Sequence, residues 1–106
     1  MTRSTDPDVT LLAALADPTR LSIVRQLAEA GRAGMICACD FVECCNVSQP
    51  TISHHLKVLR EAGVVTGERR GTNIYYALDA TFASRFAAIG VTLAGLIPLE
   101  ALPSPA

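Results

Sequence analysis

The stretch Ser48-Gln-Pro-Thr-Ile-Ser-His-His-Leu-Lys-Val-Leu59 decides the fold of this chain. Ser48 is a favourable N-cap residue and Pro50 suits a first helical turn, so we expect a helix to begin at Ser48 or Gln49. Gly63 is expected to end it. Three apolar side chains recur at helical spacing and predict the buried face of this helix: Ile52, Leu56 and Leu59.

The other positions of this helix carry side chains that hydrogen-bond base edges and phosphates. Gln pairs with adenine, Ser and Thr hydroxyls suit several bases, and the amides of a helix start favour a phosphate. An ordinary solvent-exposed polar face is the alternative interpretation. His55 lies beside the apolar stripe, so we expect it to be packed and hydrogen-bonded. The predicted DNA contacts on this helix are Ser48, Gln49, Thr51, Ser53, His54 and Lys57.

The segments on either side of this helix complete a recognisable order. A short helix is predicted from residue 39, ending at a tight turn over 46–48. Two alternating runs, 64–69 and 73–78, follow and are joined by Arg70-Gly71-Thr72. A helix-turn-helix over 39–62 followed by a hairpin over 64–78 is a winged helix-turn-helix. Arg69 and Arg70, at the hairpin tip, are expected to contact phosphates or the minor groove.

Helical patterns also occupy both ends of the chain. A short helix is predicted over 8–16, and a second begins at Pro18 with Asp17 as its N-cap. Asp79 is expected to cap a last helix over 79–97, which carries a stripe of apolar side chains. We therefore predict a single domain over 1–106, mostly α with a β-hairpin wing (α+β), between flexible tails at 1–7 and 98–106.

Composition narrows the classes of function. The chain has 106 residues, a net charge of -1 and 50% hydrophobic residues, which is a globular composition. No signal peptide and no apolar run of membrane-spanning length is evident, so we expect a cytoplasmic protein without a membrane partner. We find no nucleophile–base constellation and no glycine-rich phosphate loop, which indicates that the chain is not an enzyme.

All four cysteines fall within MICACDFVECC, residues 35–45. In a reducing compartment such a cluster favours metal binding or redox chemistry, and soft thiolates select soft ions. We expect Cys37-Ala-Cys39 to be extended, with both thiols on one side, and a third thiol to come from the helix that follows. A helix start is expected to lower the thiol pKa. The predicted metal ligands are Cys37, Cys39, Cys44 and Cys45, with either Cys44 or Cys45 as the third.

Taken in order, five motifs resemble the ArsR/SmtB family of bacterial metalloregulatory repressors. The resemblance implies a homodimer whose interface is formed by the helices at 8–16 and 79–97. It also implies binding to palindromic double-stranded operator DNA and release when a metal binds. The motifs are Ala16–Leu21, Cys37–Asp40, Ser48–Leu56, Leu59–Val64 and Gly71–Leu78.

One branch of the family, which responds to arsenic, carries the motif C-x-C-D-x-C. Cys37, Cys39 and Asp40 match it, whereas Val42 occupies the place of the third cysteine. The resemblance implies no constitutive cofactor and As(III) or Sb(III) as inducer. The alternatives are a cadmium, lead or zinc sensor that uses all four thiolates, a thiol redox-sensing repressor of the same fold, and a small thiol oxidoreductase. The chain lacks the C-x-x-C motif of the last class.

Overall fold

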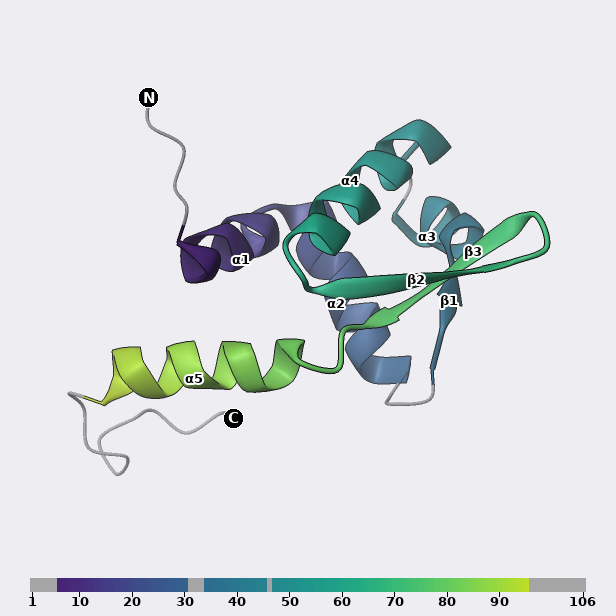
Figure 1. Cartoon of the computed structure of the whole chain (residues 1–106). Helices are drawn as coiled ribbons and strands as arrows, with labels where there is room; N and C mark the ends of the chain where they lie inside the picture. Colours follow the sequence, from purple (N-terminus) through teal and green to yellow (C-terminus); the bar gives the residue numbers. More distant parts are fainter. Residues whose placement is uncertain (1–5, 31–33, 46, 96–106) are drawn as a thin grey trace.

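The computed structural model describes residues 6–30, 34–45 and 47–95, and for residues 42–45 it describes the backbone alone. The order of elements confirms the predicted winged helix-turn-helix, mostly α with a β-hairpin wing (Figure 1). The elements are α1 (Pro7–Leu15), α2 (Pro18–Ala30), β1 (Ile36–Cys37), α3 (Ala38–Cys45), α4 (Gln49–Glu61), β2 (Val65–Arg70), β3 (Asn73–Leu78) and α5 (Phe82–Ala94).

Both ends of α4 follow from its sequence. The Ser48 hydroxyl caps the start by accepting a 3.4 Å hydrogen bond from the amide of Thr51. At the other end the amide of Gly63 donates to the carbonyl of Arg60, and the next amide donates to the carbonyl of Leu59. Gly63 has a φ of 80°, which favours glycine, and a Cβ there would lie 2.6 Å from Nη1 of Arg85.

The three strands form one antiparallel sheet in the order β1-β3-β2. The hairpin pairs Val65 with Leu78 and Arg70 with Asn73, and its turn contains Gly71 at a φ of 65°. Strand β1 was not predicted. It has two residues, too few to show alternation, and it exists because Cys37 lies opposite Tyr75 and its neighbour opposite Tyr76.

The core lies among α1 to α4 and the base of the hairpin. The predicted stripe of α4 is fully buried there, as are apolar residues from the other elements. Burying a side chain such as Leu or Phe contributes about 1.5–3 kcal/mol. This packing holds α4 in place. The largest fully buried side chains are Leu11, Ile23, Leu27, Phe41, Ile52, Leu56, Leu59, Val64 and Val65.

The last helix differs from its prediction in two ways. It begins at Phe82 and not at Asp79, because the Asp79 carboxylate accepts hydrogen bonds from the amide and hydroxyl of Thr81 within the preceding turn. Its apolar stripe is divided between two environments. Phe82 and Ile89 are buried within the subunit, whereas other apolar side chains of the stripe are exposed. None of the helices in the described part of the chain is long and apolar enough to cross a membrane.

Arg85 fixes α5 to the rest of the domain. Its Nη1 donates to the carbonyl of Ala62 at 3.2 Å, and its Nη2 donates to the carbonyl of Pro7 at 3.3 Å. One side chain therefore joins the end of α4, the start of α1 and α5. In Figure 1, α1 and α5 lie at one end of the molecule and the tip of the hairpin projects from the other.

Candidate ligand site and nucleic-acid interface

Two of the four thiols lie at the junction of β1 and α3. Cys37 is buried on β1, and Cys39 is exposed in the first turn of α3, which begins at Ala38. The expectation that Cys37-Ala-Cys39 is extended is therefore wrong for Cys39. The helix turns back on the strand, and the amide of Cys39 donates a 3.4 Å hydrogen bond to the Cys37 sulfur. The fold thus brings the pair together, although by a turn and not by an extended segment.

The electrostatics of Cys39 also differ from the prediction. The hydrogen-bonded Cys37 thiol, partial desolvation and the negative charge of Asp40 raise the pKa of the Cys39 thiol above its ordinary value. The Cys39 sulfur lies 4.0 Å from Oδ1 of Asp40. A carboxylate and a second thiol so close oppose the thiolate, and at Cys39 they outweigh the helix start that was expected to lower its pKa.

Both thiols line a cavity of about 140 Å³ that they share with α4 and the wing. Gln49 and Ser53 line it from α4, and Asn73 and Tyr76 line it from β3. This cavity, which we call the thiol cavity, joins the candidate ligand residues to the candidate DNA-contacting helix. Its complete lining is Cys37, Ala38, Cys39, Gln49, Ser53, Thr72, Asn73, Ile74 and Tyr76.

The other two cysteines occupy the last turn of α3, and their side chains lie outside the part of the chain that the structure describes. The choice between Cys44 and Cys45 therefore stays as predicted, with both open. Among the described side chains no group of three His, Cys, Asp or Glu residues is placed to hold a metal ion. The described donor set is a pair of adjacent thiols, which suits a soft, thiol-seeking ion.

The residues predicted to contact DNA from α4 lie on its surface. The apolar stripe of α4 packs inward, and the polar residues remain accessible to solvent. His55 is half-buried and its Nδ1 lies 3.2 Å from Nη1 of Arg20, as expected for a packed, hydrogen-bonded histidine. The exposed set comprises Ser48, Gln49, Thr51, Ser53, His54 and Lys57.

The wing carries two arginines, and Arg70 contacts residues of its own chain. Both are exposed at the end of β2, next to the turn. Arg70 forms a 3.2 Å ion pair with Glu68 and lies 3.5 Å from the sulfur of Met35. Its guanidinium also lies 5.5 Å from the centre of the Tyr75 ring. Arg70 is thus held against the sheet by its own chain.

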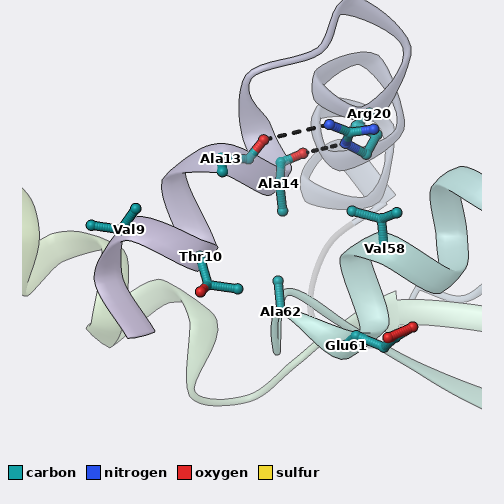
Figure 2. Close-up of a pocket in the computed structure, with 8 residues that line it drawn as sticks. All are labelled: Val9, Thr10, Ala13, Ala14, Arg20, Val58, Glu61 and Ala62. Carbon is teal, nitrogen blue, oxygen red and sulfur yellow. Dashed lines mark hydrogen bonds between the residues drawn. The ribbon is translucent and has the colours of Figure 1, made fainter. Parts of the chain in front are cut away.

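Arg20 has a structural role that no local sequence pattern indicates. Its Nε donates to the carbonyl of Ala14 at 2.6 Å and its Nη2 to that of Ala13 at 3.4 Å (Figure 2). Through its contact with His55 it connects the end of α1 to α4. The Asp17 carboxylate caps α2 through the amides of Thr19 and Arg20, each at 3.0 Å.

A groove of about 420 Å³ opens beside this arginine, between α1 and α4 (Figure 2). Its walls are mostly small apolar side chains, which leave space between the two helices. Arg20 and Glu61 are the charged residues at its edge. The remaining lining residues are Val9, Thr10, Ala13, Ala14, Val58 and Ala62.

An apolar surface remains on α1 and α5. Val9 and Leu12 of α1 line a second groove with Ile89 and Leu93 of α5. Leu93 is 69% exposed, and together with its exposed apolar neighbours it forms a patch of the kind that marks an interaction surface. The exposed large apolar residues in the described part of the chain are Val9, Leu12, Phe86, Val91 and Leu93.

The helix-turn-helix, the polar face of α4 and the hairpin define a winged helix-turn-helix regulator. The chain belongs to the arsR family of bacterial regulatory proteins, whose sequence model matches residues 17–66. The family comprises transcriptional regulators, which confirms that the chain is not an enzyme.

Individual relatives show how far the likeness extends. The HTH-type transcriptional repressor SmtB of Mycobacterium tuberculosis is 50% identical over 68 residues, covering 64% of this chain and 47% of that protein. This chain thus spans about half of its length. An arsenical resistance operon repressor of Staphylococcus xylosus is 41% identical over 73 residues, covering 69% of this chain and 66% of that protein.

Comparison with solved structures likewise finds transcriptional regulators similar to this chain. The crystal structure of a possible transcriptional regulator for arsenical resistance matches with a TM-score of 0.69 and 30% identity. The match covers 80% of this chain and 83% of that chain. The likeness therefore extends over most of the chain and is not confined to the helix-turn-helix.

Proposed function

We propose that this protein is a transcriptional repressor that binds double-stranded operator DNA and releases it when trivalent arsenic or antimony binds its cysteine cluster. The observation that carries this proposal is the thiol cavity, because Cys37 and Cys39 line it together with Gln49 and Ser53 of α4. A ligand held by the thiols lies beside the helix that would contact the bases. Two of the relatives above have arsenical resistance in their names, which supports the choice of ion.

The DNA-contacting surface that we propose combines α4 with the wing. The exposed side chains of α4 would contact bases and backbone, with the start of the helix at Ser48 facing a phosphate. Arg69 and Arg70 would contact the phosphates or the minor groove beside the site. Phosphate contacts of this kind are sequence-independent, and they make binding dependent on salt concentration.

The ligand site that we propose begins with Cys37 and Cys39 and takes a third thiol from Cys44 or Cys45. Trivalent arsenic and antimony are soft ions and bind thiolates in preference to oxygen or nitrogen ligands. Binding the third thiol would draw the end of α3 toward its start. The turn between α3 and α4 would then displace α4 from its position on the operator. Cadmium, lead or zinc with four thiolates, or an oxidised thiol pair, are alternative inducers for the same fold.

We further propose that the protein acts as a cytoplasmic homodimer. The apolar surface on α1 and α5 supports this, because a second copy of the chain would cover Leu12 and Leu93. A two-fold dimer presents two copies of α4 and therefore fits a palindromic operator. The predicted division of the chain into dimerisation helices, helix-turn-helix and wing is part of the same proposal.

Fluorescence anisotropy with a labelled duplex from the region upstream of the gene tests the proposal. Reduced protein is bound to the duplex, and sodium arsenite is added with EDTA present throughout. We expect release at about one arsenic per subunit, and we expect Cys37→Ser and Cys39→Ser chains to bind DNA normally and ignore arsenite. Normal release by both variants would contradict the thiol site. Release by peroxide, reversed by a reductant, would instead support the redox alternative.

A further inference from the structure

The thiol cavity contains polar groups as well as sulfur. Gln49 and Ser53 line it from α4, and Thr72 and Asn73 line it from the wing. These side chains offer amide and hydroxyl groups, which hydrogen-bond a hydroxyl oxygen. The cavity therefore offers thiols to a soft ion and hydrogen-bonding groups to an oxygen that the ion keeps.

The surface of α4 is divided by this cavity. Gln49 and Ser53 are four residues apart, so they lie on one face of the helix, and both line the cavity. His54 is also exposed on α4 but is not among the residues that line the cavity. Two of the predicted DNA contacts therefore adjoin the thiols, and His54 provides a comparison on the same helix.

We propose that Gln49 and Ser53 contact the arsenical directly while Cys37 and Cys39 alone hold it, by hydrogen-bonding the hydroxyl oxygen that a third thiol later replaces. This inference rests on the proposed function. In this two-thiol complex, ligand and operator compete for the same two side chains. A rearrangement of α3 is then not the only route by which the ligand releases DNA.

The chemistry of capture leaves this oxygen in place. Each thiol gives its proton to a hydroxyl group of arsenous acid, an arsenic–oxygen bond breaks, water leaves and a sulfur–arsenic bond forms. Arsenic stays trivalent, so no oxidant or reductant is needed. Since arsenous acid has three hydroxyl groups, reaction with Cys37 and Cys39 releases two waters and leaves one hydroxyl. A volume of about 140 Å³ accommodates a group of this size, since a water molecule occupies about 30 Å³ in the liquid.

The test uses the full chain with Cys44→Ser and Cys45→Ser, in which no third sulfur displaces the oxygen. Arsenite affinity is measured without DNA, from the near-ultraviolet absorption of the sulfur–arsenic bonds. We expect Gln49→Ala and Ser53→Ala to weaken arsenite binding by about three- to tenfold each, as for loss of one hydrogen bond. Ser53→Thr, which keeps the hydroxyl, should restore the affinity, and His54→Ala should leave it unchanged.

The outcomes separate this inference from the proposed function. Unchanged arsenite affinity in both alanine variants would overturn the inference, as would failure of the Cys44→Ser/Cys45→Ser chain to bind arsenite. In either case release of DNA by arsenite from the unmodified chain would leave the proposed function intact. If the unmodified chain binds no arsenite, the proposed function fails and the inference fails with it.

Discussion

Cys37 lies opposite Tyr75 in the antiparallel pairing of β1 with β3. A candidate ligand residue is thereby part of the same sheet as the wing. The Tyr75 ring lies against Arg70, whose guanidinium also reaches the sulfur of Met35, two residues before Cys37. A movement of the Cys37 thiol would therefore be transmitted to the wing through β3 and through Arg70. It would also be transmitted to α4 through the thiol cavity.

Replacing the two cysteines of the last turn of α3 one at a time should identify the third ligand. We expect one of Cys44→Ser and Cys45→Ser to weaken arsenite-induced release of DNA by at least tenfold, and the other to behave as the unmodified chain. The cause is the loss of one sulfur–arsenic bond in the affected variant. Anisotropy titration measures the effect, and equal behaviour of both single variants would show that neither thiol alone is the third ligand.

Asp40→Asn should make Cys39 more reactive. The Cys37 thiol and, less strongly, the Asp40 carboxylate hold the pKa of the Cys39 thiol above its ordinary value. Removing the negative charge lowers that pKa, so more thiolate is present at a given pH below it. The rate of alkylation by iodoacetamide, followed by mass spectrometry between pH 7 and 10, should reach its midpoint at a lower pH. A midpoint that does not move would contradict this electrostatic role of Asp40.

Arg20→Ala should destabilise the fold. The substitution removes the hydrogen bonds to the carbonyls of Ala13 and Ala14 and the contact with His55. Since hydrogen bonds from a charged group contribute more than neutral ones, we expect a loss of about 1–3 kcal/mol in the free energy of unfolding. Urea denaturation followed by circular dichroism measures it. Arg25→Ala, at an exposed position of the same helix, is the matched control and should change stability by less than about 0.5 kcal/mol.

Asp17 should contribute stability that is lost in acid. The amide of Arg20, and then the charges of Arg20 and His55 and the amide of Thr19, lower the pKa of Asp17 below its ordinary value of 3.8. A carboxyl whose folded pKa is depressed stabilises the fold above the unfolded pKa, and this stabilisation disappears as the pH falls through the folded pKa. Asp17→Asn keeps a capping side chain but does not titrate. Its difference from the unmodified chain in urea denaturation should therefore shrink as the pH falls below about 4, and a pH-independent difference would contradict the argument.

Leu93→Glu should dissociate the proposed dimer. Leu93 is 69% exposed in the subunit and lines the groove between α1 and α5, so a carboxylate there would oppose burial against a second copy. Val91→Glu is the control, because Val91 is 72% exposed but lies about 200° around the helix from Leu93. Sedimentation velocity should show a monomer for the first variant and a dimer for the second. A dimer that survives Leu93→Glu would place the interface elsewhere.

Much of the fold was predictable because it depends on local signals. The cap at Ser48, the apolar spacing of α4, the glycine at position 63 and the alternation of the hairpin each act within a few residues of the chain. The exposure of the polar residues of α4 follows from the burial of its apolar stripe. His55 was likewise predictable, since it lies beside that stripe, whereas its partner Arg20 is 35 residues away.

The thiol site was only partly predictable. The sequence indicates a cluster of cysteines at the start of a helix, but an extended Cys37-Ala-Cys39 was expected and the helix begins between the two cysteines. The pKa of Cys39 differs from its prediction because the neighbouring thiol and carboxylate, which the fold brings close, outweigh the general effect of a helix start. The third ligand stays a prediction.

The sequence by itself determined the helices, the hairpin and their order, because helix caps, apolar periodicity and turn glycines are short-range properties. Only the tertiary structure decided that β1 pairs with β3 and that two thiols, the start of α4 and the wing surround one cavity. Those relationships join residues far apart in the chain, and a two-residue strand has no pattern of its own. Its pairing depends on where the packed core places α3 against the hairpin.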